Sequence, residues 1–164
     1  VAASMGLYGA LLTAQGRMAE ALEVLQTATE MATRIVGAAS PLAIQDRLFL
    51  TEALTISGNL ARARELAAQN LALTSERFGA TGVLTLRVRL SLARIELEAG
   101  HADLAQSQFA ALVEPLRQAG RPGQPLAAHA LFGQGEALLA LRRPAEAVAP
   151  LREAVALREQ LLWA

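Results

Sequence analysis

Apolar residues recur along this chain at spacings of three and four, the periodicity of one face of an α-helix. Ala21, Leu25 and Ala28 are one such set. No segment alternates polar and apolar residues with a period of two over a useful length, so strands are not expected. The pattern predicts an all-α chain with helices at residues 2–15, 18–36, 41–57, 60–78, 83–99, 102–119, 125–141 and 144–162.

The same pattern recurs with a constant 42-residue period, the interval from Gly16 to Gly58 and again from Gly58 to Gly100. The predicted tight turns thus hold a glycine three times, and Arg142 stands at the fourth turn position, one further period along. An alanine follows every turn position by five residues. The structural repeat positions are Gly16, Gly58, Gly100, Ala21, Ala63, Ala105 and Ala147. This recurrence indicates tandem repeats, each with a helix A, a tight turn, a longer helix B and a Gly-rich joint.

The joints define the repeat boundaries. Ser40-Pro41 marks a helix start, because Ser caps exposed amides and Pro fits the first helical position. We expect a single domain over residues 1–164, with repeats at about 2–40, 41–82, 83–124 and 125–164. The first residue is Val rather than Met, so we expect the chain to be part of a larger protein.

Five residues depart from the repeat pattern. Arg142 has to adopt the left-handed conformation of a turn glycine, at a cost of about 1 kcal/mol. Pro115 and Pro150 lie inside predicted helices, and each is expected to kink its helix or end it early. Asn70 and Glu96 occupy positions that are usually apolar, which would disturb the packing of the second and third repeats.

Composition narrows the function. Hydrophobic residues make up 53% of the 164, enough for a sizeable core. Fifteen basic and fifteen acidic residues give no net charge, so nucleic acid is not an expected partner. The chain has no cysteine, which excludes disulfides and thiolate metal sites and leaves the localisation open. No run is apolar enough for a membrane helix, and the start lacks the basic region of a signal peptide.

The repeat resembles the tetratricopeptide repeat, whose signature is a large residue, Leu-Gly or Leu-Ala, an apolar residue, a turn Gly, and Ala five residues later. The first repeat matches at Tyr8-Gly9, Leu12, Gly16, Ala21, Leu25 and Ala28. The 42-residue period exceeds that of the common form and is similar to the period of kinesin light chain repeats. The segment AEAVAPLREAVALREQLL from Ala145 is most similar in sequence to repeats that follow bacterial serine/threonine protein kinase domains, although no kinase motif is present.

This resemblance implies an α-solenoid, a right-handed superhelix of four helix-turn-helix repeats whose A helices line a concave groove. It implies a scaffold without catalysis, cofactor or metal that binds a protein or peptide there. The implied groove residues are Gln45, Leu48, Phe49, Glu52, Arg87, Leu90, Arg94, His129, Phe132 and Glu136. Apolar anchors beside two arginines suit a peptide with apolar side chains and one or two acidic groups. Alternatively, Leu48, Leu90 and Phe132 are partly core and both arginines are solvated.

Other functions stay open. An oligomerisation module would pair copies through terminal repeats, since the chain finishes on Leu161-Leu162-Trp163 without a polar closing helix. An exposed tail carrying Trp163 is the alternative to such self-association. An enzyme or a small-molecule sensor on the same fold is a third class. However, His101 and His129 lack further ligands at metal-binding spacing, and no catalytic set follows from spacing.

Overall fold

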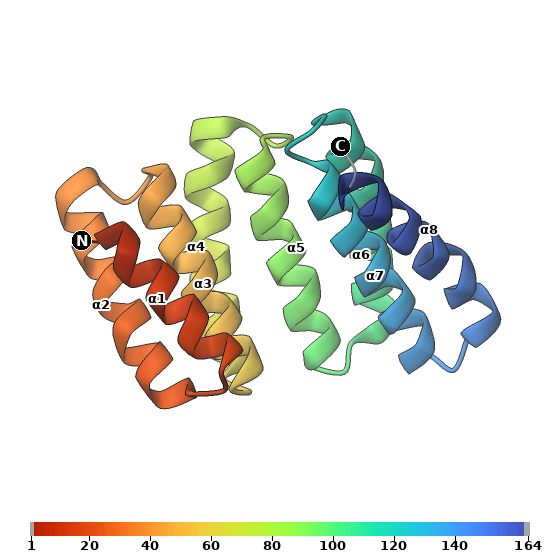
Figure 1. Ribbon diagram of the computed structural model, residues 1–164, viewed down its shortest axis with the longest axis horizontal. Helices are drawn as coiled ribbons and strands as arrows, with labels where there is room; N and C mark the ends of the chain where they lie inside the picture. The colour runs from red at the N-terminus through yellow and green to blue at the C-terminus, as the bar shows by residue number, and fades with distance from the viewer. Residues whose placement is uncertain (1, 163–164) are drawn as a thin grey trace. The chain divides into compact units, whose positions relative to one another are not determined.

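The computed structural model describes residues 2–162, and these residues form eight helices and no strand (Figure 1). The helices are α1 (Ala2–Ala14), α2 (Met18–Val36), α3 (Pro41–Ile56), α4 (Leu60–Phe78), α5 (Val83–Glu98), α6 (Ala102–Gln118), α7 (Gln124–Ala140) and α8 (Pro144–Leu162). Every helix lies within one residue of its expected bounds, so the prediction of an all-α chain is confirmed. Trp163 lies outside the described residues.

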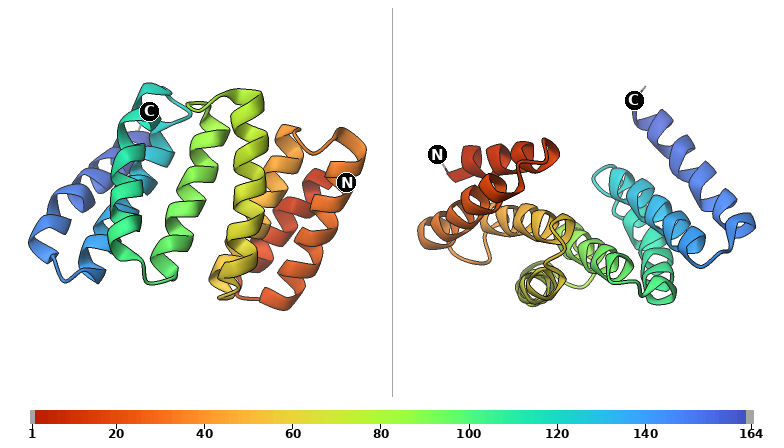
Figure 2. Two further views of the ribbon diagram at one scale, coloured as in Figure 1. Left: turned by 180° about the vertical axis from the view of Figure 1, so that it is seen from behind. Right: turned by 90° about the horizontal axis from the view of Figure 1, so that it is seen from below.

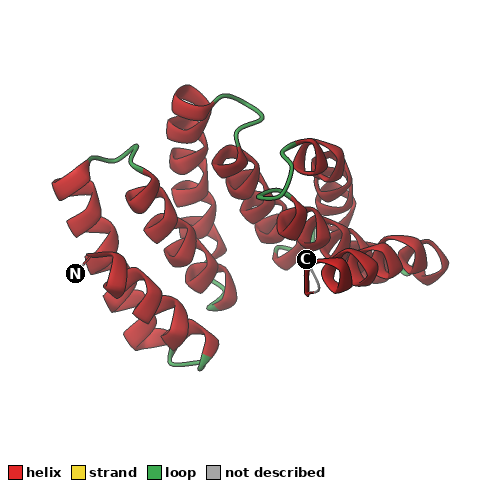
Figure 3. Cartoon of the chain, turned by 45° about the horizontal axis from the view of Figure 1, so that its top comes forward, coloured by secondary structure: helices red, strands yellow, loops and turns green. Residues whose placement is uncertain are grey.

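The chain divides into two compact units, Val1–Gly79 and Ala80–Ala164. In the first unit α1 packs on α2, α2 on α3 and α3 on α4, and α1 also touches α3. In the second unit α5 to α8 pack in the same order, and α5 also touches α7. Successive helices within each unit run antiparallel (Figure 2), and short loops join them (Figure 3). The A helices are therefore α1, α3, α5 and α7, and each is followed by its B helix.

Each tight turn between an A helix and its B helix is closed by a residue with positive φ. The φ values are 75° at Gly16, 79° at Gly58, 84° at Gly100 and 59° at Arg142. After α1, the N–H of Arg17 donates to the carbonyl of Leu12 and the N–H of Gly16 to that of Thr13, both at 3.0 Å. This is the Schellman arrangement, which satisfies the last carbonyls of a helix. The expected left-handed Arg142 is confirmed.

Small residues allow helices A and B to approach closely. A Cβ atom at Gly9 would overlap the side chain of Leu25, and one at Gly135 would overlap Leu151. The four alanines that follow the turns are buried as well: Ala21, Ala63, Ala105 and Ala147. Gly9 and Gly135 are therefore close contacts between helix A and helix B.

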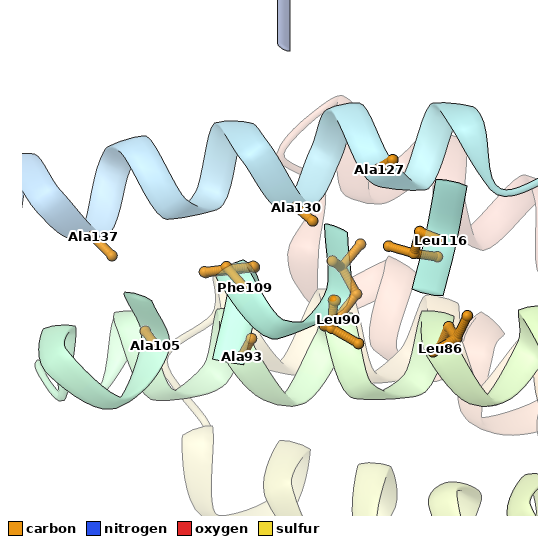
Figure 4. Close-up of a cluster of buried hydrophobic side chains, with 10 residues drawn as sticks. Leu86, Leu90, Ala93, Ala105, Phe109, Leu116, Ala127, Ala130 and Ala137 are labelled. Atoms are coloured by element: carbon orange, nitrogen blue, oxygen red, sulfur yellow. The ribbon is translucent and has the colours of Figure 1, made fainter. Parts of the chain in front are cut away.

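The core of the second unit is continuous between α5, α6 and α7. It comprises Leu86, Leu90, Ala93, Ala105, Phe109, Leu112, Leu116, Ala127, Ala130 and Ala137. Phe109 lies between the facing helices (Figure 4), and a Cβ at Gly133 of α7 would overlap its ring. The large ring thus fills the space that a small residue on the next A helix leaves open.

Asn70 does not disturb the packing of the second repeat, because the nitrogen and the oxygen of its amide each have a hydrogen-bond partner. Its Nδ2 donates to the carbonyl of Ile44 at 3.2 Å, and its Oδ1 accepts from Arg47 at 3.1 Å. The Arg47 guanidinium also donates to the carbonyl of Ala38 at 2.9 Å and to the Thr33 hydroxyl at 3.2 Å. Asn70 and Arg47 are both buried, and burial lowers the pKa of Arg47. A polar network therefore takes the place of apolar packing here.

The early helix ends expected at the two prolines are wrong. Helix α6 continues past Pro115 to Gln118, and α8 continues past Pro150 to Leu162. A proline removes only the bond from its own nitrogen to the carbonyl four residues earlier, and the neighbouring helical bonds persist. Pro150 is also buried, so its ring contributes to the packing of α8. A kink at either proline stays a prediction.

Replacing Arg142 by glycine is expected to stabilise the protein. Arg142 is the one non-glycine residue with positive φ among the described residues, and that conformation costs about 1 kcal/mol for a residue with a Cβ. Arg142→Gly should therefore raise the free energy of unfolding in urea by about 1 kcal/mol, less a few tenths for the added freedom of the unfolded chain. The reciprocal change Gly58→Arg should lower it by a similar amount. A gain from both changes would contradict the explanation.

Breaking the Arg47 network on one side is expected to be costly. Asn70→Ala leaves a buried guanidinium with fewer acceptors, which should lower the free energy of unfolding by about 2–4 kcal/mol. The residues two repeat periods later hold the same places in the fourth repeat and are the buried pair Leu131 and Ala154. The double variant Arg47→Leu with Asn70→Ala reproduces that pair and should recover most of the loss. If the double variant is less stable than Asn70→Ala alone, the network is not the cause.

Candidate functional site

Helix α3 carries the predicted groove residues of the first unit. Gln45 and Phe49 are half-buried and Glu52 is exposed, and their spacing places them on one face of the helix. Leu48 is buried and belongs to the core, as the alternative interpretation held. The first unit therefore presents an amide, part of an aromatic ring and a carboxylate along α3.

In the second unit, Arg94 of α5 and Glu136 of α7 form an ion pair. Nη2 of Arg94 lies 2.6 Å from Oε2 of Glu136, and Nη1 lies 3.7 Å from Oε1 of Glu98. The guanidinium also lies over the ring of Phe109, 5.8 Å from its centre. Arg94 and Glu136 are separated by one full repeat period, so they hold the same position in successive A helices. Both predicted groove residues thus partly neutralise each other, and Arg94 is not simply solvated.

Of the other two predicted groove residues on α5, Leu90 offers little apolar surface to a ligand. Leu90 is buried in the core cluster with Phe109 and Ala130. Arg87 is half-buried on the same helix. The interpretation of Leu90 as an apolar anchor for a ligand is therefore corrected, because its side chain is used in packing between helices α5, α6 and α7.

Among the described residues of the second unit, the exposed aromatic ring is that of Phe132 on α7. It is 36% exposed, and the guanidinium of Arg158 on α8 lies over it, 5.4 Å from the ring centre. This distance is within the range of a cation–π interaction. The repeat pattern contains a signal for Arg158, because Ala32, Thr74 and Leu116 hold the same position in the other B helices and are fully buried. An arginine at this otherwise buried position was not recognised as a site residue from the sequence.

His129 lies one helical turn before Phe132 on the same helix. Its pKa is lowered, first because the surrounding protein disfavours the charged imidazolium, and then because of the positive charges of Arg94 and Arg158. Glu136 acts in the opposite direction. His129 is therefore neutral at pH 7, and its ring supplies one donor and one acceptor beside Phe132.

Glu96 and His101, two other residues singled out in the sequence, contact each other in the structure. Glu96, expected to disturb packing, is half-buried, and its Oε2 lies 2.7 Å from Nδ1 of His101.

Between residues 2 and 162 no group of three histidines or carboxylates could hold a metal ion. None of the described helices has the length and apolarity needed to cross a membrane.

Comparison with known proteins agrees with this repeat architecture. The family of tetratricopeptide repeats matches residues 1–42 and 135–162 of the chain, which contain the first repeat and most of the last. No curated protein matches the sequence. The family match thus reaches both compact units.

Two solved structures show the same fold over nearly the whole chain. BtubC (BKLC) from P. vanneervenii superimposes with a TM-score of 0.74 at 18% identity, covering 96% of this chain and 63% of BtubC. A Podosopora anserina protein assigned as a kinesin light chain, with nearly identical TPR-like repeats, gives a TM-score of 0.74 at 20% identity. That alignment covers 96% of this chain and 74% of the other. The chain therefore spans less than two thirds of the length of BtubC.

The structural comparisons show the fold. The chain has the fold of an α-solenoid built from tetratricopeptide-type repeats, as the sequence predicted. Its structural neighbours include kinesin-light-chain-like arrays, which fits the 42-residue period. Repeats of this type generally form scaffolds for protein interaction and do not catalyse reactions.

The charge environment of His129 can be measured directly. Arg158→Gln removes a nearby positive charge and should raise the His129 pKa, while Glu136→Gln removes a negative charge and should lower it further. NMR titration of the imidazole resonances measures both shifts. Arg152→Gln, on the exposed surface of the same helix α8, is the matched control and should leave the titration unchanged. Equal shifts in Arg152→Gln and Arg158→Gln would contradict the described site.

Proposed function

We propose that this chain is a non-catalytic scaffold that binds a protein or peptide against its A helices. The observation that supports this most strongly is the exposed ring of Phe132 with the Arg158 guanidinium over it. Aromatic and arginine side chains contribute most of the binding energy at protein interfaces. Here one of each is held in a fixed relation on two packed helices, so little side-chain freedom is lost when a ligand binds.

The chemistry of this surface favours a ligand with an apolar side chain next to an acidic group. Phe132 offers an aromatic face, and Arg158 has no carboxylate partner among residues 2–162. A ligand carboxylate can accept two parallel hydrogen bonds from a guanidinium, which adds direction to the attraction. Arg94 is already paired with Glu136, so it adds less net charge than the sequence suggested. Phe49, with Gln45 and Glu52, offers a separate surface on the first unit.

The chain itself is proposed to be one tetratricopeptide-repeat domain over residues 1–164 that serves as the interaction region of a larger bacterial signalling protein. A serine/threonine protein kinase is the specific candidate. This proposal is supported by the sequence of the last repeat from Ala145, which is similar to the repeats that follow such kinase domains. Sequencing the gene on both sides of this segment tests the proposal, and a parent without any signalling domain would overturn it.

An oligomerisation module is the second candidate, and one surface favours it. Helix α1 has no charged side chain, and Leu7, Tyr8 and Leu11 are 65%, 48% and 53% exposed. The same positions in α7 are Gly133, Gln134 and Ala137, of which Gly133 and Ala137 are buried against the preceding B helix. Sedimentation at increasing concentration tests this candidate, with Leu7→Ser and Leu11→Ser together as the variant. A strict monomer at high concentration would exclude it.

Peptide selection tests the binding proposal without a known partner. A displayed library of random 12-residue peptides is selected on the immobilised chain, and the affinities of enriched peptides are measured by fluorescence polarisation. We expect enrichment of an acidic residue near an apolar one, and a loss of affinity of about tenfold or more in Phe132→Ala and in Arg158→Gln.

Matched controls separate binding from stability. Leu139→Ala removes an exposed apolar side chain from the same helix α7, and Arg152→Gln removes an exposed arginine from α8. Both controls should bind the selected peptides as the unchanged chain does. Peptides that bind all four variants equally, or a selection that enriches no sequence, would overturn the proposed surface.

A further inference from the structure

Asp46 on α3 is a buried carboxyl group without a partner for one of its oxygens. The residue is only 1% exposed, and Oδ2 accepts no hydrogen bond. It lies directly against α1, because a Cβ atom at Gly6 would overlap Oδ1 of Asp46. An ionised carboxylate in this place loses its hydration, and hydrogen bonds from the protein do not compensate for that loss. The contact between α1 and α3 therefore includes an uncompensated group.

The second unit shows what the same contact is like without the carboxylate. Two repeat periods after Gly6 and Asp46, the equivalent positions hold Leu90 and Ala130. Both are buried members of one hydrophobic cluster (Figure 4). Where the second unit has a leucine and an alanine, the first unit thus has a glycine, which has no side chain, and an aspartate. The volume is conserved approximately, and the polarity is reversed.

Charged neighbours do not compensate Asp46 within the described part of the first unit. On α3 itself, Arg47 is bonded to Ala38, Thr33 and Asn70, and Glu52 is exposed. Helix α1 has Tyr8 as its one ionisable side chain, and it is exposed. Helix α2 contributes exposed residues: Glu20, Glu23, Glu30 and Arg34. Helix α4 contacts α3 where Asn70 donates to the carbonyl of Ile44. Its charged residues are Arg62, Arg64, Glu65, Glu76 and Arg77.

We propose that Asp46 is a proton-sensitive latch for the N-terminal half of α1, whose docking on α3 is strengthened when this carboxyl group takes up a proton. Protonation removes the buried charge and gives the carboxyl group an O–H donor. The C-terminal half of α1 is held independently, because Gly9 packs against Leu25 and Leu12 is buried. The latch therefore acts on the first two turns of the helix.

The direction of the pH dependence follows from burial. Burial raises the pKa of Asp46 above its ordinary value, so the folded state binds this proton more tightly than the unfolded state does. Docking is then strongest below the ordinary aspartate pKa of about 3.9 and weakens as the pH rises through the raised value. Surface carboxylates that form ion pairs behave in the opposite way, so the two effects are distinguishable.

Hydrogen exchange measured along α1 tests the latch. Protection factors of the helical amides of residues 6–9, corrected for the intrinsic pH dependence, should rise as the pH falls from 7 toward 4.5. The rise approaches a limit of about tenfold per pH unit between the raised pKa and the ordinary aspartate pKa of about 3.9. Amides of residues 12–14, in the independently held half of α1 that carries no ionisable side chain, serve as the internal reference. A constant or falling protection of residues 6–9 on acidification would overturn the proposal.

Three variants identify the group responsible. Asp46→Asn keeps the shape without the titration and should abolish the pH dependence at residues 6–9. Glu52→Gln, an exposed carboxylate on the same helix, is the matched control and should retain it. Gly6→Leu with Asp46→Ala copies the pair found in the second unit and should give high protection at both pH values. Persistence of the pH dependence in Asp46→Asn would assign it to another group and refute the latch.

Discussion

The left-handed turn between helices A and B is the constraint on which each repeat depends. It reverses the chain within about three residues, and the Schellman bonds satisfy the carbonyls that the ending helix leaves open. Five residues later helix B buries an alanine, which is Ala21 in the first repeat. This close contact brings the two helix axes near enough for Gly9 and Leu25 to interlock. The A helices then keep one face that their own B helices do not cover.

The two units use the same backbone plan with different interior chemistry. In the first unit, Arg47 and Asn70 form a buried polar network in which both polar amide atoms of Asn70 have a partner. Asp46 is buried too, yet one of its oxygens is unpartnered. Two repeat periods later, in the fourth repeat, the equivalent residues Ala130, Leu131 and Ala154 are buried and apolar. Because a satisfied network and an orphaned carboxylate differ by several kcal/mol in low dielectric, polar residues at equivalent depth have opposite effects on stability.

Prediction from the sequence succeeds where the signal is local and loses power where helices meet. The turns and the cap at Ser40 depend on a few neighbouring residues, and the Ser40 hydroxyl indeed accepts a backbone hydrogen bond at 3.2 Å. The expected early end at Pro150 is wrong, because the loss of a single hydrogen bond is outweighed by the remaining helical bonds and by the packing of the buried ring. Groove positions from the family pattern found Phe132 but also included Leu48, which the structure uses in the core. Arg158 was missed because periodicity shows which positions are equivalent and leaves open which of them contact each other.

Departures from the repeat pattern carry most of the specific chemistry of this scaffold. A residue that conforms to the pattern is occupied by packing with its neighbours, as Leu90 is. A residue that departs from it is held by the same backbone. Its polar atoms either find a new partner within the unit, as those of Asn70 do, or stay available for another purpose. Arg158, at a position where the other B helices bury small or apolar side chains, and Asp46, at a position where α7 has Ala130, both fit this description. The regular part of the repeat fixes their positions, and their chemistry makes each repeat distinct.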